Sequence, residues 1–142
     1  MTENKQITIV VAVIKNERGQ ILFAKRKEPG NPEVDGKWEF PGGKIEFGEE
    51  PEQAVIREAK EETGLTIKIE RLLPKVYTNV WQKSEYQDNY QVLILSYECT
   101  VVSGVIKISD QEISELKYFS PSKINYPECL PKMKEIIELL NS

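Results

Sequence analysis

Residues 43–65 read GKIEFGEEPEQAVIREAKEETGL, and this stretch decides how the whole chain is interpreted. After a glycine turn come acidic residues and Pro51, then good helix formers, and finally Gly64. Acidic residues and proline are typical of the first turn of a helix, and glycine is typical of the position after its last turn. The pattern therefore predicts a helix within residues 48–64, held between two loops.

The predicted helix carries three glutamates on one face, Glu58, Glu61 and Glu62. A helix turns by roughly 100° per residue, so side chains three and four positions apart are neighbours. By the same geometry Glu62 lies only about 20° from Val55, a residue expected to face the core. The carboxylates should therefore border the packed face, where like charges at this spacing repel one another.

Two interpretations account for this acidic face. A hard divalent cation such as Mg²⁺ or Mn²⁺ would neutralise the carboxylates and would also bind the phosphates of a substrate. Alternatively, this is an ordinary charged surface helix in which Arg57 and Lys60 are the partners of the acids. The spacing of the residues alone leaves both interpretations open.

The rest of the chain is rich in strand signals. Runs of β-branched and aromatic residues between turn residues predict strands, and an amphipathic pattern predicts a terminal helix. The predicted strands lie at residues 7–15, 20–26, 37–43 with a break at Pro41-Gly42-Gly43, 65–73, 75–81, 89–102 and 115–120, the terminal helix at 131–141 and a short helix near Ser120-Pro121. The first two strands read as a β-hairpin. This order predicts an α/β protein, in which a mixed sheet has a few helices packed on its faces.

The composition limits the class of protein. A chain of 142 residues is the size of one domain. Its 19 basic and 23 acidic residues give a net charge of −4 and the basic residues are scattered, so binding to nucleic acid is not expected. No apolar run approaches the roughly 20 residues of a membrane span and the N-terminus is polar, so we expect no membrane association and a cytoplasmic location.

Cysteine and histidine usage restricts the available chemistry. Cys99 and Cys129 match no metal or redox spacing and are expected to be half-buried thiols in a reducing compartment. The chain has 0 histidines, so acid–base chemistry must use carboxylates, lysine, tyrosine, water or a metal.

The stretch that opens this section resembles the signature of the Nudix hydrolases. The positions that the signature specifies are Gly43, Glu49, Arg57-Glu58-Ala59, Glu61-Glu62 and Gly64-Leu65, and all of them are filled. The resemblance extends to the hairpin before the motif, to the run WEFPGGKIEFGE and to the strand-rich tail, which look like the MutT-type branch of the family.

The resemblance implies a fold and a metal site. The expected fold is the Nudix fold, an α/β/α sandwich with a mixed β-sheet and a catalytic loop–helix–loop, in a single Nudix hydrolase domain over residues 1–142. Glu58, Glu61 and Glu62 would be ligands of Mg²⁺ or Mn²⁺, and the carbonyl of Gly42 would be a further ligand. A metal-activated water would then attack a phosphorus atom of a nucleoside diphosphate derivative.

Other residues receive supporting roles from the same resemblance. Arg57 would form an ion pair with Glu49 and hold the loop against the helix. A carboxylate outside the motif would assist as a base or an additional ligand, with Glu112 as the first candidate and Asp110 as the second. Each of these two acids has an alternative interpretation as a solvated loop residue.

Candidate substrate contacts lie outside the signature. Arg26, at the end of the second predicted strand, and Lys44, after the double glycine, could face phosphates or be plain surface charges. Trp81, Tyr77 and Tyr86 could provide a stacking surface for a base, although aromatic residues in strands are also typical of a core.

The identity of the base is less well indicated. MutT-type enzymes that cleanse 8-oxo-dGTP read the purine partly with an asparagine just before the terminal helix, where this chain has Cys129 or Leu130. This departure argues against specificity for 8-oxoguanine. Members of the same branch that act on cytidine nucleotides are similar in having Tyr-Pro here, as in Tyr126-Pro127, so Tyr126 is a candidate substrate contact.

Three functions remain open at this point. The first is a Mg²⁺-dependent pyrophosphohydrolase that converts a nucleoside triphosphate into the monophosphate and pyrophosphate. The second is a hydrolase of nucleoside diphosphate sugars or related conjugates, and the third is a nucleotide-binding module without turnover. The strand-rich segment 75–102 also offers an edge through which a homodimer could form.

Overall fold

The structure is a computed structural model that describes residues 2–82 and 88–142. Tyr86, one of the predicted stacking residues, lies outside this described part. The strands are β1 (Asn4–Lys15), β2 (Ile21–Arg26), β3 (Trp38–Glu39), β4 (Gly42–Lys44), β5 (Thr66–Leu72), β6 (Tyr77–Trp81), β7 (Asn89–Ser103) and β8 (Ile113–Phe119). The helices are α1 (Pro51–Thr63) and α2 (Met133–Glu138), with short 3₁₀ turns at Pro121–Lys123, Tyr126–Glu128 and Leu139–Asn141.

The described strands form one mixed sheet. Its main path runs β3-β2-β1-β7-β5, while β4 pairs with β1, β6 with β7 and β8 with β2. The parallel pair β1–β7 is continuous from Asn4 opposite Asn89 to Lys15 opposite Thr100, and the other pairs are antiparallel. The expected hairpin of the first two strands is present as the antiparallel pair β1–β2.

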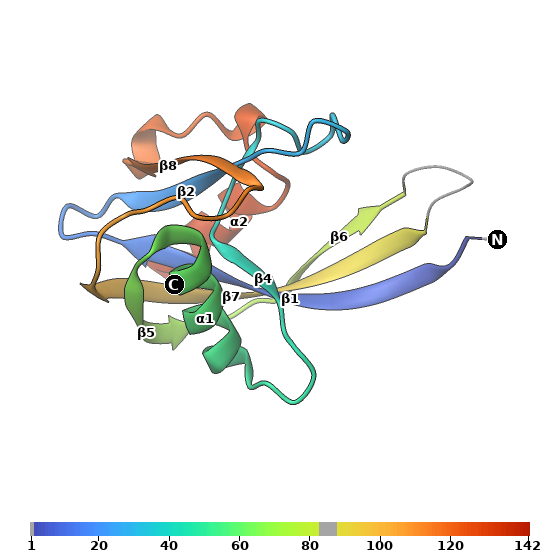
Figure 1. Cartoon of the computed structure of the whole chain (residues 1–142). Helices are drawn as coiled ribbons and strands as arrows, with labels where there is room; N and C mark the ends of the chain where they lie inside the picture. Colours follow the sequence, from blue (N-terminus) through green and yellow to red (C-terminus); the bar gives the residue numbers. More distant parts are fainter. Residues whose placement is uncertain (1, 83–87) are drawn as a thin grey trace.

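The two helices cover opposite faces of the sheet (Figure 1). Alternate side chains of β1 point to opposite faces, so Val10, Ala12 and Ile14 pack in the cluster that contains the buried side of α1. Val11 and Val13 pack in the second cluster, with Met133 and other residues of α2. The α/β/α sandwich predicted for the chain is therefore confirmed.

The predicted strand at 37–43 breaks at Pro41 as expected, and the chain continues after the break as a second strand. Trp38–Glu39 pairs with β2, whereas Gly42–Lys44 pairs with β1. Pro41 lies between them and has no N–H to donate to a ladder, which explains the interruption. The chain crosses from one strand of the sheet to another at this point and brings the double glycine beside β1.

Helix α1 begins and ends as its sequence predicts. Pro51 occupies the first turn, the backbone N–H of Glu50 donates to Oε1 of Gln53 at 3.0 Å, and Gly64 ends the helix with a φ of 79°. The buried residues are Ala54, Val55, Ala59 and Thr63. The small side chain of Ala59 is completely enclosed, so this position of the motif lies directly against the sheet.

The terminal helix is shorter than predicted. It starts at Met133 because Lys132 adopts a left-handed conformation, with a φ of 77°, directly after Pro131. In the part of the chain that the structure describes, no helix combines the length and the apolar character needed to cross a membrane. Strand β6 has β7 on one side, and among the described residues no strand pairs with its other side, so the homodimer stays a prediction.

Candidate active site

A cavity of about 580 Å³ lies over the face of the sheet that also carries α2, and two kinds of residue line it. One group, which we call the carboxylate side, contains Arg26, Glu28, Glu39, Gly42, Gly43, Glu58, Glu62, Asp110 and Glu112. The other group, the apolar side, contains Ile7, Ile9, Asn79, Trp81, Tyr90, Val92, Ile94, Leu130, Pro131, Met133 and Ile136. Strand β1 joins the two, since Val11 pairs with Gly42 and Ile7 pairs with Val92.

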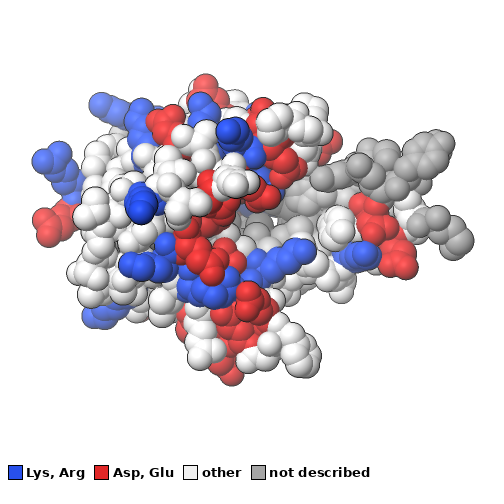
Figure 2. Space-filling model, in the orientation of Figure 1, with Lys and Arg blue, Asp and Glu red and all other residues white. Residues whose placement is uncertain are grey.

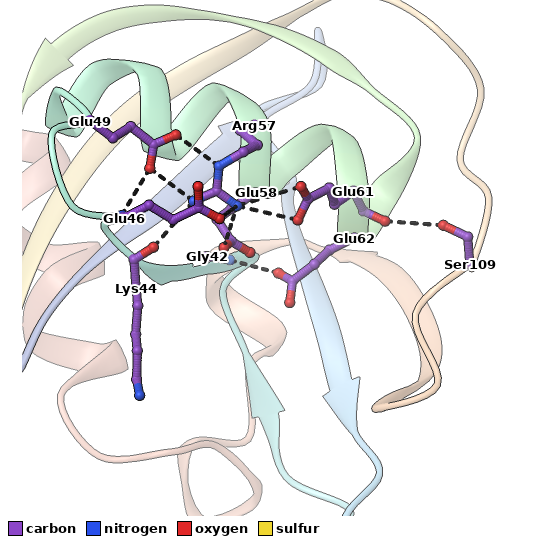
Figure 3. Close-up of polar contacts among 9 residues, drawn as sticks. All are labelled: Gly42, Lys44, Glu46, Glu49, Arg57, Glu58, Glu61, Glu62 and Ser109. Carbon is purple, nitrogen blue, oxygen red and sulfur yellow. Dashed lines mark hydrogen bonds and ion pairs between the residues drawn. The ribbon is translucent and has the colours of Figure 1, made fainter.

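Arg57 is the centre of the polar network on α1 (Figure 3). Its guanidinium binds both carboxylate oxygens of Glu49, with Nε to Oε2 at 2.8 Å and Nη2 to Oε1 at 2.9 Å. The ion pair predicted between Arg57 and Glu49 is thus present, and the guanidinium holds the pKa of Glu49 at about 2. Because Nη2 also donates to the carbonyl of Lys44, Arg57 ties the loop before the helix to the helix itself.

The same guanidinium reaches two of the predicted metal ligands. Nη1 of Arg57 lies 2.9 Å from Glu58 and 3.3 Å from Glu61. The repulsion within the acidic face is therefore relieved in part by Arg57. Glu58 has a side-chain exposure of 16%, whereas that of Glu61 is 57%, so Glu58 lies inside the site and Glu61 at its rim.

The double glycine lets the backbone approach the carboxylates. A Cβ atom on Gly43 would lie 2.6 Å from Cδ of Glu58, and one on Gly42 would lie 2.1 Å from the carbonyl oxygen of Val10. The backbone N–H of Gly42 donates to Oε1 of Glu62 at 2.7 Å. Larger residues at these two positions would displace either the helix or strand β1.

Burial changes the acidity of the carboxylate side. Desolvation, with smaller contributions from the neighbouring Glu39, Glu58 and Asp110, raises the pKa of Glu62 to about 9, against the lowering effect of the Gly42 N–H. Desolvation also raises the pKa of Glu58, against the effect of Arg57. Several acids thus share a space that disfavours their ionised forms, and a bound cation would reverse this effect.

Glu39 was not among the residues that the sequence indicated. Its carboxylate is mostly buried beside Arg26, with Nη1 of the arginine 3.3 Å from Oε2, and burial raises its pKa to about 7. The available signal was a charged residue inside the apolar run WEF, between the buried Trp38 and Phe40. Arg26 itself lies in the cavity as predicted, and its buried Nε has no hydrogen-bond partner in the described structure.

The segment after β7 brings two further acids to the site. Asp110 and Glu112 line the same cavity as Glu58 and Glu62. The segment is attached to the end of α1, because the hydroxyl of Ser109 donates to the carbonyl of Glu61 at 3.0 Å and the N–H of Lys107 donates to the carbonyl of Thr63 at 2.9 Å. These carbonyls belong to the last turn of the helix, where no intrahelical donor is available.

The residues of the carboxylate side fit a hard divalent cation. Their donors are carboxylate and carbonyl oxygens, which Mg²⁺ and Mn²⁺ prefer, and the partly buried Glu62 has a backbone N–H as its hydrogen-bond partner. In residues 2–82 and 88–142, no three acidic, cysteine or histidine side chains are already grouped as a metal cage. Glu58 and Glu61 turn toward Arg57 instead.

The apolar side combines residues from distant parts of the sequence. Trp81 of β6 is opposite Tyr90 of β7, and both line the cavity. Asn79, two residues before Trp81 on the same face of β6, also lines it. The sequence indicated Trp81, whereas the contributions of Asn79 and Tyr90 depend on the pairing of β6 with β7.

The other three candidate contacts differ in their relation to the cavity. Tyr126 packs against the core cluster around α2 and is not among the residues that line the cavity. Tyr77 is likewise packed against that cluster. Lys44 does line the cavity, but its side chain extends away from the carboxylates of α1 (Figure 3).

The surface around the site is mixed in charge. Figure 2 shows acidic side chains gathered over α1 and the adjoining loops, with basic side chains directly among and beside them. An anionic substrate would therefore meet basic groups at the rim of an acidic centre.

Comparisons with known proteins agree with this arrangement. The model of the NUDIX domain family matches residues 5–140. An 8-oxo-dGTP diphosphatase of Escherichia coli (strain K12) is 48% identical over 62 residues, which is 44% of this chain and 46% of that protein. An ADP-ribose pyrophosphatase of Methanocaldococcus jannaschii is 33% identical over 130 residues, which is 92% of this chain and 70% of that protein.

The fold is similar to that of a solved structure along almost the whole chain. The crystal structure of a MutT protein from Methanosarcina mazei Go1 has a TM-score of 0.77 at 26% identity, and the match covers 99% of this chain and 96% of that one. Curated 8-oxo-dGTP diphosphatases from Escherichia coli and Proteus vulgaris match over only 46% and 58% of their own length.

Proposed function

This chain belongs to the Nudix family, and from that membership we propose that it is a Mg²⁺-dependent pyrophosphohydrolase that cleaves a nucleoside triphosphate into the monophosphate and pyrophosphate. One observation carries the proposal. A single cavity has carboxylates, most of them partly buried, on one side and uncharged, mainly aromatic and aliphatic residues on the other. Such a cavity suits a ligand with a charged phosphate chain at one end and a flat base at the other.

The metal would be held on the carboxylate side. Glu58, Glu61 and Glu62 are the proposed side-chain ligands, with the carbonyl of Gly42 as a further oxygen. A divalent cation bound there would acidify a water molecule and neutralise charge on the phosphate oxygens. For Glu58 and Glu61, ligation requires that their carboxylates turn away from Arg57.

The remaining residues would position groups and move protons. Arg57, which binds Glu49, holds the loop before α1 against the helix. Glu112 or Asp110, both of which line the cavity, would accept the proton of the attacking water. Arg26 and Lys44, which both line the cavity, are the proposed basic contacts of the phosphate chain.

One alternative has specific support. The relative named as an ADP-ribose pyrophosphatase aligns with 92% of this chain, which favours a nucleoside diphosphate conjugate as the competing substrate class. A binding module without turnover is the remaining alternative. The presence of Glu58, Glu61 and Glu62 argues against it, because such a module has no need of all three ligands.

The first experiment is a phosphate-release screen at alkaline pH with Mg²⁺, with and without added inorganic pyrophosphatase. Ordinary and oxidised nucleoside triphosphates, nucleotide sugars and ADP-ribose are the substrates, and chromatography identifies the products. We expect a triphosphate that gives phosphate only when pyrophosphatase is added. Cleavage of the conjugates alone would establish the alternative, and survival of every substrate would leave the binding module.

Metal binding can be measured without turnover. A cation that binds the folded chain raises its melting temperature by mass action. We expect Mg²⁺ and Mn²⁺ to stabilise the protein, and Glu58→Gln to remove most of that effect. Glu46→Gln is the matched control, because Glu46 is an exposed acid of the same patch, 3.8 Å from Arg57. Equal stabilisation of all three proteins would contradict the metal site.

A further inference from the structure

The apolar side of the cavity contains very few groups that could read a base. Among its described lining residues, from β1, β6, β7 and residues 130–136, none is charged. Polar side-chain atoms come from the amide of Asn79, the hydroxyl of Tyr90 and the indole N–H of Trp81. The indole N–H only donates, so a side-chain oxygen that accepts from an amino group of a base on this side must come from Asn79 or Tyr90.

The orientation of the Asn79 amide follows from one long contact with its neighbour. Nδ2 lies 3.4 Å from the carbonyl oxygen of Pro131. A carbonyl oxygen only accepts, so the nitrogen of the amide must face Pro131 and the oxygen must face away from it. In the part of the chain that the structure describes, no hydrogen bond to Oδ1 of Asn79 is present. Among the described residues, this oxygen therefore accepts from no donor.

Asn79 lies close enough to Trp81 to contact a base that stacks on Trp81. Trp81 and Asn79 are two residues apart on β6 and share one face of the strand, so their Cα atoms are roughly 7 Å apart. Trp81 lies opposite Tyr90, and Asn79 lies opposite Val92. A base that stacks on Trp81 therefore extends its edge toward Asn79 over an apolar floor.

We propose, on the basis of the nucleotide activity proposed above, that Asn79 determines base specificity. Its acceptor oxygen selects a base with an exocyclic amino group on the pairing edge, cytosine or adenine, over the keto counterparts uracil and hypoxanthine. An amino group donates to Oδ1, whereas a keto oxygen at the same place would face it lone pair to lone pair. The hydroxyl of Tyr90 can donate or accept, so it does not distinguish the two.

Matched pairs of substrates test this assignment. CTP competes with UTP, and ATP with ITP, in equimolar mixtures with Mg²⁺, and chromatography of the monophosphates gives the ratio of kcat/KM within each pair. Within the pair that the protein hydrolyses, pyrimidine or purine, we expect kcat/KM for the amino member to be about 3- to 10-fold higher than for the keto member. This ratio corresponds to one net hydrogen bond. Asn79→Val, which suits a strand, should bring the ratio close to one.

Two further variants separate the acceptor from the shape of the side chain. Asn79→Asp keeps an acceptor in place and should retain a preference for the amino member. Thr78→Val changes the opposite, exposed face of the same strand and should leave the ratio as in the parent protein. A parent protein that prefers the keto member or neither, or an Asn79→Val protein with an unchanged ratio, would overturn the proposal while leaving the proposed hydrolysis intact.

Binding of the products tests Asn79 independently of hydrolysis. Saturation-transfer NMR compares CMP with UMP and AMP with IMP on the metal-free protein. We expect the amino member of the accepted pair to bind more tightly, and this difference to disappear in Asn79→Val. If no triphosphate is hydrolysed, the proposed activity fails but this measurement still decides the role of Asn79, since equal binding within both pairs contradicts it.

Discussion

The two sides of the cavity are built in different ways. One continuous stretch, residues 42–62, forms the centre of the carboxylate side and places Glu49, Arg57 and Glu58 together. Residues from β2 to β3 and from the segment after β7 complete this side. The apolar side combines β1, β6, β7 and the residues before α2, which are far apart in the sequence. Residues of the apolar side lie outside the motif that carries the proposed chemistry, so substitutions there need not disturb it.

This difference has a functional consequence. If chemistry and base recognition belong to separate sides, substitutions on the carboxylate side should change turnover and those on the apolar side should change binding. The measurements below, ordered from the largest expected effect to the smallest, test that separation.

The largest effect should follow from removing a proposed metal ligand. Glu58→Gln or Glu61→Gln loses several kcal/mol of transition-state stabilisation, which corresponds to about 10³-fold in kcat or more. Binding of the nucleoside monophosphate to the apolar side should persist, because Trp81 and Asn79 are unchanged. Steady-state kinetics and circular dichroism provide the readouts, with Glu46→Gln as the charge-matched control. Near-normal kcat in both variants would refute the metal assignment.

A smaller effect is expected from the stacking surface. Trp81→Ala removes a contact worth about 1–3 kcal/mol per base, so KM should rise roughly 5- to 100-fold. Turnover at saturation and stabilisation by Mn²⁺ should stay close to those of the parent protein. Val80→Ala is the control, because Val80 is on the opposite face of β6 and is 61% exposed. A loss in kcat rather than in KM would show that the two sides are not separable.

The attachment of the acidic segment to α1 should have an effect of a few fold. Ser109→Ala removes the hydrogen bond to the carbonyl of Glu61. Because Asp110 and Glu112 are then held less firmly, we expect kcat to fall by about 2- to 10-fold. Ser109→Thr, which keeps a hydroxyl, should restore most of the rate.

A double-mutant cycle shows whether Ser109 acts through Glu112. In the Glu112→Gln background, Ser109→Ala should have little further effect on kcat. Independent, multiplying losses would mean that Ser109 supports the structure without positioning Glu112. Ser114→Ala, which loses a long contact of 3.5 Å to the carbonyl of Lys25, is the control within the same part of the chain.

The smallest effect concerns stability at low pH. Arg57 lowers the pKa of Glu49 from 4.5 to about 2, so this ion pair adds stability above pH 4.5 and loses it as the pH falls toward 2. Denaturant unfolding between pH 7 and pH 2.5 should show a smaller acid-induced loss for Glu49→Gln than for the parent protein. Glu17→Gln, in an exposed turn, should follow the parent curve. Parallel curves of unfolding free energy against pH for all three proteins would show that Glu49 does not contribute to the acid-induced loss of stability.

The sequence predicted the carboxylate side because helical geometry is local. The spacing of Glu58 and Glu62 relative to Val55 placed both acids at the border of the packed face, and both line the cavity in the structure. The family was confirmed because its signature lies within a few residues, and the mixed sheet with helices on its faces was confirmed with it. The break at Pro41 was predicted, whereas the return of Gly42–Lys44 to the sheet beside β1 was missed.

Most residues of the apolar side could not be predicted from the sequence. Asn79 faces the cavity because of the register of β6 on β7, and that register is set by contacts between strands. Tyr126 was placed at the site from a dipeptide, but the turn Tyr126–Glu128 directs it into the core cluster. Glu39 could have been found from its position between two buried aromatic residues.

The long parallel pair of β1 and β7 also sets the order in which the chain can fold. Partners in this ladder, such as Gln6 and Gln91, are 85 residues apart. Closing so long a loop is slow compared with forming a helix, which takes place within microseconds. On a ribosome, α1 and its loop can form early, whereas the floor of the cavity must wait until residue 100 has emerged. The helix of the motif is thus synthesised before the floor of the cavity, and also before Tyr97 and Cys99 of β7, which share its core cluster.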